Sequence, residues 1–329
     1  EQREIFGERW GLSSEHVYEN AQDMLASEKL DLVSICTTAR VRHDITIAAA
    51  EAGVRGLWLE KPVSLSLAES DAMVEACATR GIHLAAGDAY RNMPQHWKVK
   101  RLIDSGEIGA VQSINLYQST TEISGGGCQG LSVLRLFADD ADVDWVSGWC
   151  GSDPNSDVDQ NMAGHVRFAS GLDAFIHGRR TPLEGIEVLC SNGVYHSSWS
   201  GGHLWRTDSN GKLELVEDFF DEFGARDDWL SPSGTRQRGG IQSIVESLDR
   251  DIEPRCSGAN MCKVLELAIG LRESHRNDFA PVKFPIQDRS LKIIPHESRY
   301  LNKKQVLGEE KYAEQINASA AQPLGGAVA

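Results

Sequence analysis

The sequence lacks the long hydrophobic runs of membrane proteins, because no stretch approaches the roughly 18 apolar residues that a membrane span needs. Positive charge is also scarce: 33 Lys and Arg residues stand against 48 Asp and Glu residues, for a formal net charge of -15. This balance argues against a nucleic-acid partner, since phosphate binding needs a basic face. The seven cysteines, an odd number spread over a long chain, do not form the pattern of a disulfide framework.

The cysteine spacing also argues against a metal site. Cys256 and Cys262 lie close together but have no companion pair, so they do not fit the usual zinc-ligand spacing. We therefore expect reduced thiols in a cytoplasmic protein, and no metal. The 329 residues are enough for two domains at about 100 to 200 residues each. A composition of 41% hydrophobic and 25% charged residues is that of an ordinary globular protein.

Three short apolar runs in the first third of the chain end in polar residues. They cover residues 31–36, 54–59 and 82–87, and the polar residues that follow are Thr37-Thr38, Glu60-Lys61-Pro62 and Asp88-Ala89-Tyr90-Arg91. Helical patterns separate the runs, the second of them opening with the capping box Ser66-Leu67-Ala68-Glu69. Strand, helix, strand, helix, strand predicts a doubly wound parallel sheet. We expect the three polar strand ends to meet at its carboxyl edge, where such folds bind ligands.

These residues resemble a known family. The segments "VSICTTARVRHDITIAAAEAGVRGLWLEKP" and "GDAYRNMPQHWKVKRLIDSGEIGAV" are similar to the Gfo/Idh/MocA oxidoreductases, named after glucose-fructose oxidoreductase, inositol dehydrogenase and rhizopine catabolism. The resemblance weakens toward residue 290. It implies a Rossmann-type dinucleotide-binding domain over residues 1–108, with NAD or NADP as the cofactor.

The chain begins with Glu1, and its first residues are typical of the end of a helix. The family normally precedes this point with a strand, a Gly-rich turn and a second strand that hold the dinucleotide pyrophosphate and ribose. We therefore expect the Rossmann domain to be N-terminally incomplete. Either the sequence is a fragment, which is the simpler explanation and leaves an export signal open, or half of the nucleotide site is lost.

The periodicity changes after residue 108. Segments near residues 110–118, 164–178, 185–199 and 203–217 are strand-like, and they are joined by the turn signals Ser170-Gly171, Asn192-Gly193 and Asn210-Gly211. This pattern predicts an α+β domain over residues 109–290 with a mostly antiparallel, open sheet. Two helices follow, with apolar stripes at Ile241, Ile244, Val245 and Leu248 and at Met261, Val264, Leu265 and Ala268. Residues 291–329 form an extension that we expect to be partly mobile.

By the resemblance, the open sheet is a substrate domain that also packs against a second subunit. We therefore expect a homo-oligomer and a small-molecule sugar or polyol substrate, with neither a nucleic acid nor a membrane as a partner.

Lys61 is the main catalytic candidate. An ammonium at the mouth of a largely apolar strand is partly desolvated, which lets it share a proton near neutral pH. It could bond to a substrate oxygen and stabilise alkoxide character as a C–H bond breaks. The alternative is a structural lysine paired with Glu60. Glu60 itself could accept hydrogen bonds from a cofactor ribose or orient Lys61.

Three further residues are candidates for cofactor binding. Thr37 and Thr38 could line the cofactor with their hydroxyls and backbone, although such residues also serve as helix N-caps. His43 matches the family's His after the threonine turn. A lone His that opens a helix can equally be a cap or a core contact.

The substrate side of the site departs from the family pattern. Tyr90 and Arg91 match the family's strand-end Arg motif and are predicted to bind substrate, with a surface ion pair as the alternative for Arg91. Family dehydrogenases carry a catalytic His and an Asp on a later helix, and the corresponding positions here are Gln129 and Ser132. Gln cannot exchange a proton near pH 7, so that role falls to Lys61, to an unaligned residue, or to none. His165 and His177 in the sheet domain are possible substitutes, although a half-buried strand histidine is usually structural.

The sequence therefore leads to one main hypothesis and two alternatives. The main hypothesis is an NAD(P)-dependent oxidoreductase that transfers a hydride between the nicotinamide and a sugar, cyclitol or related polyol. The second is a glycosidase or lyase of the same family that uses bound NAD transiently. The third is a non-catalytic binding or regulatory protein, because Gln129 and Ser132 replace the usual His and Asp.

Overall fold

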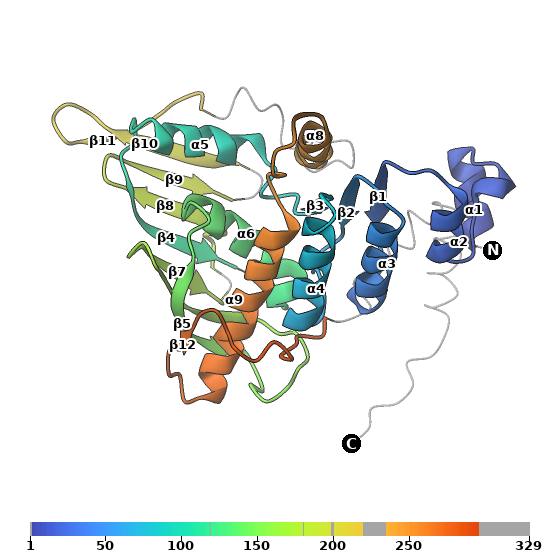
Figure 1. Cartoon of the computed structure of the whole chain (residues 1–329). Coiled ribbons are helices and arrows are strands. Elements are labelled where there is room, and N and C mark those ends of the chain that lie inside the picture. The colour runs from blue at the N-terminus through green and yellow to red at the C-terminus, as the bar shows by residue number, and fades with distance from the viewer. Residues whose placement is uncertain (1, 119, 180, 199–200, 220–234, 296–329) are drawn as a thin grey trace, which may run out of the picture. The chain divides into compact units, whose positions relative to one another are not determined.

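The structure is a computed structural model that describes residues 2–118, 120–179, 181–198, 201–219 and 235–295 (Figure 1). The chain divides into two compact units, one containing Glu1–Leu30 and the other Asp31–His296. The first unit has the helices α1 (Gln2–Trp10) and α2 (Ala21–Ser27), separated by the short 3-10 helix η1 (Ser14–His16). Asn20 caps the second helix, because its side chain accepts the N–H of Asp23 at 2.8 Å.

The second unit begins with a small parallel sheet in the order β1 (Leu32–Ile35), β2 (Gly56–Leu59), β3 (His83–Ala86). Helices α3 (Ala39–Glu51) and α4 (Leu67–Ala78) make the crossovers. The predicted capping box opens α4: Ser66 accepts the N–H of Glu69, and the Glu69 carboxylate accepts the N–H of Ser66. The predicted parallel α/β arrangement is confirmed.

The outer edge of β3 is covered by a segment from much later in the chain. The N–H of Ala86 donates to the carbonyl of Cys256 at 2.9 Å, and Ala85 forms an isolated bridge with Ser257. Gly258 lies so close to Leu84 that an added Cβ would meet its side chain at 2.3 Å. The small sheet is therefore completed by residues from beyond the predicted domain boundary at residue 108.

A larger sheet follows, in the order β11-β10-β9-β8-β4-β7-β6-β5-β12, with only the pair β4 and β7 parallel. Its strands are β4 (Val111–Tyr117), β5 (Val143–Cys150), β6 (Met162–Phe168), β7 (Asp173–His177), β8 (Gly185–Cys190), β9 (Gly193–Ser197), β10 (Gly202–Thr207), β11 (Leu213–Leu215) and β12 (Val282–Lys283). The predicted mostly antiparallel sheet and its three hairpins are confirmed. The sequence patterns missed β5 and β12.

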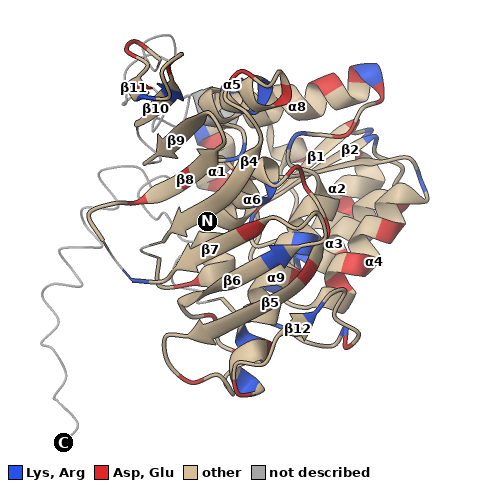
Figure 2. Cartoon of the chain, turned by 90° about the vertical axis from the view of Figure 1, so that its left-hand side faces the viewer, with Lys and Arg blue, Asp and Glu red and all other residues tan. Residues whose placement is uncertain are grey.

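Helices cover one face of this sheet, while the other face turns toward the viewer in Figure 2. The helical segments are α5 (Pro94–Asp104), the π-helical turn η2 (Ile123–Gly127), α6 (Cys128–Phe137), α8 (Thr235–Arg250) and α9 (Gly258–Arg276). Helix α9 packs along β5 and also contacts α6, α4 and β3, so it joins the two sheets of this unit (Figure 1).

The apolar stripe predicted for α8 is only partly buried. Ile244 is buried, but Ile241 and Val245 are 55% and 44% exposed. The inward face of the helix is made instead by small residues, because a Cβ at Gly240 would lie 2.2 Å from the ring of Trp58. The helix thus approaches the first sheet too closely for a large side chain there.

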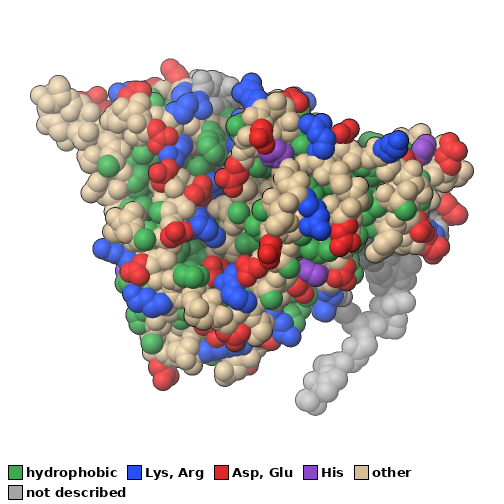
Figure 3. Space-filling model, viewed as in Figure 1, with side chains coloured by type: hydrophobic (Ala, Val, Ile, Leu, Met, Phe, Trp, Pro, Cys, Tyr) green, Lys and Arg blue, Asp and Glu red, His purple; other side chains and the backbone are tan. Residues whose placement is uncertain are grey.

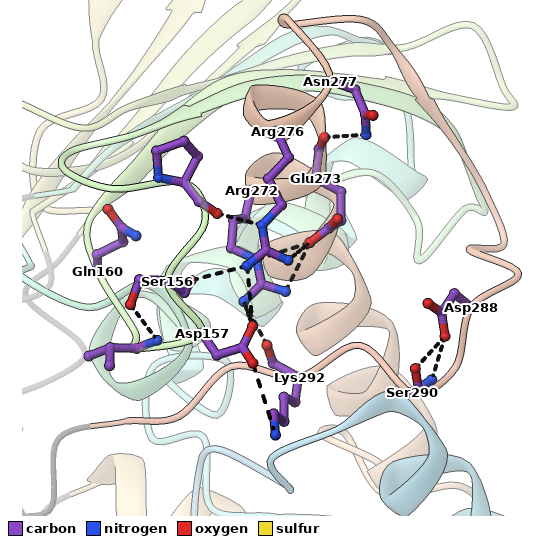
Figure 4. A network of polar contacts seen from close by, with 12 residues as sticks. Ser156, Asp157, Gln160, Arg272, Glu273, Arg276, Asn277, Asp288, Ser290 and Lys292 are labelled. Carbon is purple, nitrogen blue, oxygen red and sulfur yellow. Dashed lines mark hydrogen bonds and ion pairs between the residues drawn. The ribbon is translucent and has the colours of Figure 1, made fainter.

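A network of ion pairs fixes the end of α9 (Figure 4). Asp157 lies 3.3 Å from Arg272 and 3.2 Å from Arg276, and Glu273 pairs with the same two guanidinium groups. Arg272, which is fully buried, also donates to the carbonyl of Lys292 at 2.6 Å. The network ties the loop before β6 and the segment after β12 to one helix.

Charged side chains of both signs are scattered over the face seen in Figure 3, without a large patch of one sign. None of the helices that the structure describes combines the length and the apolar character required to cross a membrane.

Candidate functional site

The polar ends of β1, β2 and β3 lie at one edge of the first sheet. Ile35, Leu59 and Ala86 are in register across the three strands. The ladder continues one step further, since Glu60 N–H donates to Ile35 O at 3.1 Å and Gly87 N–H to Leu59 O at 2.6 Å. The residues that follow each strand therefore share one edge, as the sequence predicts.

Arg42, which the sequence analysis did not single out, joins two of these strand ends. It is fully buried on α3, and its guanidinium donates to the carbonyls of Thr37 and Pro62. These bonds hold the threonine turn against the Glu60-Lys61-Pro62 segment. The Arg42 side chain thus helps to hold the two strand ends of the site in position.

Lys61 reaches from this edge to a second element. Its half-buried side chain donates through Nζ to the carbonyl of Gly125 at 2.7 Å. Gly125 lies in η2, the turn that leads into α6, so the ammonium links the first sheet to the loop that carries Gln129 on its following helix. No ion pair between Lys61 and Glu60 is found among the described residues.

Asp159 holds that loop, and the sequence analysis missed it as well. Its buried carboxylate accepts the N–H groups of Ile123 at 3.1 Å, Ser124 at 3.1 Å and Gly125 at 2.7 Å. The Ser124 hydroxyl donates to it at 2.7 Å. Gly125 therefore has its N–H fixed by Asp159 and its carbonyl fixed by Lys61.

Burial shapes the electrostatics of the edge. Desolvation raises the pKa of Glu60 above its ordinary value, although the nearby charges of Lys61 and Arg42 oppose the shift. Desolvation also raises the pKa of Asp88 to about 6, against hydrogen bonds from the N–H groups of Tyr90 and Arg91. Burial likewise raises the pKa of the Cys128 thiol, so this cysteine stays protonated and is no nucleophile.

The three cofactor-binding candidates on α3 and its entry differ in their surroundings. The Thr37 hydroxyl is buried and has no hydrogen-bond partner among the described residues. Thr38 occupies the N-cap position of α3, but its side chain makes no capping bond. The His43 ring bonds at 2.8 Å to Asp44 on the same helix, whose side chain is 81% exposed.

Two of the predicted substrate residues belong to another group of contacts. Arg91 is buried and donates to the carbonyls of Ser132 at 2.8 Å and Arg255 at 2.5 Å, and to the carboxylate of Asp140. The Ser132 hydroxyl is buried and accepts a bond from Asn260 on α9 at 3.0 Å. The structure thus gives Arg91 and Ser132 packing partners on the α9 side, and substrate contact remains a prediction for both.

The remaining candidates are distributed over several elements. Tyr90 is half-buried beside Asp88, and Gln129 is half-buried in the first turn of α6. His165 and His177, considered as substitutes for the family histidine, lie on β6 and β7 of the large sheet. His165 bonds to Asp173 at 2.7 Å, and His177 stacks on Tyr117 with 4.7 Å between ring centroids. Within the described ranges, no cluster of three His, Cys, Asp or Glu residues is arranged to hold a metal ion.

Comparison with known proteins agrees with this geometry. Residues 1–88 match the family model GFO_IDH_MocA, described as an oxidoreductase family with an NAD-binding Rossmann fold. Over this range the chain is similar to the Gfo/Idh/MocA oxidoreductases. The matched range contains all three strands of the small sheet and the Glu60-Lys61-Pro62 segment.

Two curated relatives are similar to parts of the chain. The chain is 38% identical over 103 residues to D-apiose dehydrogenase of Paraburkholderia graminis, which covers 31% of this chain and 27% of that protein. It is 29% identical over 209 residues to myo-inositol 2-dehydrogenase of Thermotoga maritima, covering 55% of this chain and 60% of that one. The chain thus matches less than two thirds of the length of either relative.

The fold is shared more widely. A solved inositol dehydrogenase homologue from Azotobacter vinelandii, complexed with NADH and myo-inositol, superposes with a TM-score of 0.71 over 86% of each chain at 13% identity. This likeness shows that the fold of the large sheet, and not only that of the matched N-terminal range, is shared with the solved homologue.

Proposed function

We propose that the protein is an NAD(P)-dependent oxidoreductase that transfers a hydride between a nicotinamide cofactor and a sugar, cyclitol or related polyol. The observation that carries this proposal is the position of Lys61, whose ammonium lies at the shared edge of the three parallel strands and bonds to the Gly125 loop. The NAD-binding description of the matched family and the names of the two dehydrogenase relatives support this reaction class.

The strand edge fits one side of a dinucleotide. The buried, unpartnered hydroxyl of Thr37 can bond to a cofactor oxygen or amide, and an occupant would remove the free-energy cost of leaving it unsatisfied. Thr38, Glu60 and His43 are the other residues assigned to this side. The nicotinamide of NAD or NADP would supply the hydride acceptor or donor.

In the oxidation direction, the C–H bond of the substrate carbinol breaks with transfer of hydride, and the hydroxyl loses its proton to become a carbonyl. Lys61 would donate a hydrogen bond to that oxygen and stabilise its negative charge. An ammonium has three donors, so two remain beside its bond to Gly125. Because Gln129 cannot exchange a proton, Lys61 would take the hydroxyl proton as a neutral amine in the oxidation direction, and as an ammonium it would return that proton in the reduction direction. Tyr90, Arg91, Gln129 and Ser132 are proposed to bind or shape the substrate side.

Replacing Lys61 tests the proposal. The full-length protein would be assayed for NAD and NADP reduction against a panel of polyols and aldoses. We expect Lys61→Ala to lower kcat by about 10²- to 10⁴-fold, the usual contribution of a positioned proton donor. Lys212→Ala is the matched control, because this lysine is 73% exposed on the large sheet. Turnover that is unchanged in Lys61→Ala would refute the assignment.

The replacement of a proton-exchanging side chain by Gln129 supports one other candidate, a non-catalytic binding protein. Binding of cofactor and polyol without turnover would select it. Cleavage of glycosides without net nicotinamide reduction would instead select a family hydrolase or lyase.

We also propose that the open face of the large sheet packs against a second copy of the chain. Trp149 and Phe175 are 52% and 39% exposed on this face. They line a shallow cavity of about 730 Å³ together with His165 and His177. Trp149→Glu is expected to lower the molar mass measured by light scattering, and an unchanged mass would count against the interface. The unpaired state of all seven cysteines supports a cytoplasmic location.

A further inference from the structure

A second cavity, of about 420 Å³, opens beside the first turn of α9. Its lining includes Arg91, Arg135, Arg255 and Lys263, with Asp140 and Glu253 as the acidic residues, and none of the residues assigned above to the cofactor. The lining thus has two more positive than negative side chains. This volume lies within the range of small-molecule sites.

Two of the positive charges are buried with almost no anionic partner. Arg135 is 1% exposed, and its guanidinium donates only to neutral acceptors: Asn260 Oδ1 at 2.9 Å and the carbonyls of Asp140 at 2.9 Å and Ala141 at 3.2 Å. Burial lowers the pKa of Arg135 from its ordinary value, which shows the strain on the charged form. A buried charge is costly unless an opposite charge compensates it.

Arg91 is in a similar position. It is 3% exposed, and two of its three bonded partners are backbone carbonyls. The third is the carboxylate of Asp140, whose side chain is 43% exposed. Among the described residues, Asp140 thus bonds to Arg91 through its carboxylate and to Arg135 through its backbone carbonyl, and both guanidinium groups line the cavity.

The rim of the cavity adds two more cations that remain accessible. The side chain of Arg255 is 35% exposed and lies 5.7 Å from the ring centroid of Trp97, while Lys263 is 47% exposed and pairs with Asp142 at 2.6 Å. Ser257, the N-cap of the 19-residue α9, is also in the lining, so the positive end of the helix dipole faces the same space.

We infer that this cavity binds a compact dianion of the phosphate-monoester class, at a site that does not include Lys61 and that shares only Arg91 with the substrate side proposed above. The buried guanidinium groups supply the fixed charge, and Arg255 and Lys263 supply the donors that contact the ligand. Arg255 and Lys263 each pair with one partly exposed carboxylate, Glu246 at 3.6 Å and Asp142 at 2.6 Å, and a bound phosphate monoester would compete with these carboxylates for the two cations. Planar guanidinium groups are well suited to phosphate oxygens.

Binding is tested by isothermal titration calorimetry on the full-length protein, with inorganic phosphate and glycerol 3-phosphate as probes and glycerol as the neutral comparison. We expect saturable binding of both phosphates and none of glycerol. Arg255→Ala and Lys263→Ala should each weaken phosphate binding about ten-fold, because each removes a charge-assisted contact. Both residues are accessible, so the variants are expected to fold, which circular dichroism would verify.

Two further variants complete the design. Glu253→Gln removes an exposed acid from the lining and should tighten phosphate binding, an effect that damage to the fold would not produce. Arg206→Ala, at an arginine that is 48% exposed on β10, is the control and should leave binding unchanged. Absence of saturable phosphate binding would overturn the inference. Binding that Lys61→Ala weakens but Arg255→Ala and Lys263→Ala do not would also overturn it, by placing the anion at the strand edge.

Discussion

Asp159 is expected to set both the stability of the η2 loop and the position of Lys61. In the wild type, the N–H groups of Ser124 and Gly125 bond to the same carboxylate oxygen, Oδ2 of Asp159. In Asp159→Asn, an NH₂ group replaces that oxygen and faces these two N–H groups without accepting from them. Two charge-assisted bonds of about 1.5 to 3 kcal/mol each are lost. Removing a buried charge offsets part of this loss. We expect the free energy of unfolding to fall by about 2 to 4 kcal/mol.

The assay is urea unfolding followed by circular dichroism, together with amide hydrogen exchange. Relative to the wild type, Asp159→Asn should exchange the amide hydrogens of Ser124 and Gly125 faster, while the amide hydrogens of the sheets should change less. Asp153→Asn is the matched control in the same connecting segment, because Asp153 is exposed and only closes a local turn with Asn155. A change below about 0.5 kcal/mol in Asp159→Asn, the range of ordinary surface substitutions, would refute this role.

Three other perturbations follow from buried polar groups. Because burial raises the pKa of Asp88 to about 6 from 3.8, its protonated form favours the folded state. The wild type should therefore lose roughly 2 kcal/mol of unfolding free energy relative to Asp88→Asn as the pH rises from 4 to 7, measured by urea unfolding at several pH values, and parallel pH curves for the two proteins would contradict this. Arg42→Met leaves the carbonyls of Thr37 and Pro62 without their buried donor and should lower the unfolding free energy by about 2 to 4 kcal/mol, whereas the exposed Arg40→Met should not. Asp157→Asn should lower the unfolding free energy by about 1 to 2 kcal/mol, and with it the melting temperature, because the ion pairs at the end of α9 are lost. Added salt should reduce the difference in melting temperature between the two proteins, and a difference that does not depend on salt would argue against an ionic origin.

Local signals in the sequence were sufficient for most elements of the fold. The capping box at Ser66 and the Asn-Gly turn at Asn210 each have a mechanism within a few residues, so they could be read without the structure. Strand β5 was missed because its residues Trp145, Ser147 and Gly148 break a clear alternation, and its pairing with β6 and β12 is decided by distant segments.

The sequence predicted only those residues of the candidate site whose signal lies close by in the sequence. Glu60 and Lys61 stand at a strand end, and the register of parallel strands follows from pattern alone. Arg42 and Asp159 bond to backbone groups far away in the sequence, and nothing around either residue signals that role. Arg91 and Ser132 were predicted to bind substrate, but the structure bonds Arg91 to Ser132, Arg255 and Asp140. The Ser132 side chain bonds to Asn260 on α9 and to Asp88.

Cys256 and Ser257 pair with the outer edge of β3. A division of the chain before these residues would therefore leave this strand edge unpaired. A fragment ending near residue 88, where the family match ends, would leave the unpaired backbone of that strand open to solvent. Open strand edges recruit other chains, so such a fragment is expected to aggregate even though all three of its strands are present. The range that matches the family model is therefore not expected to fold as an independent unit.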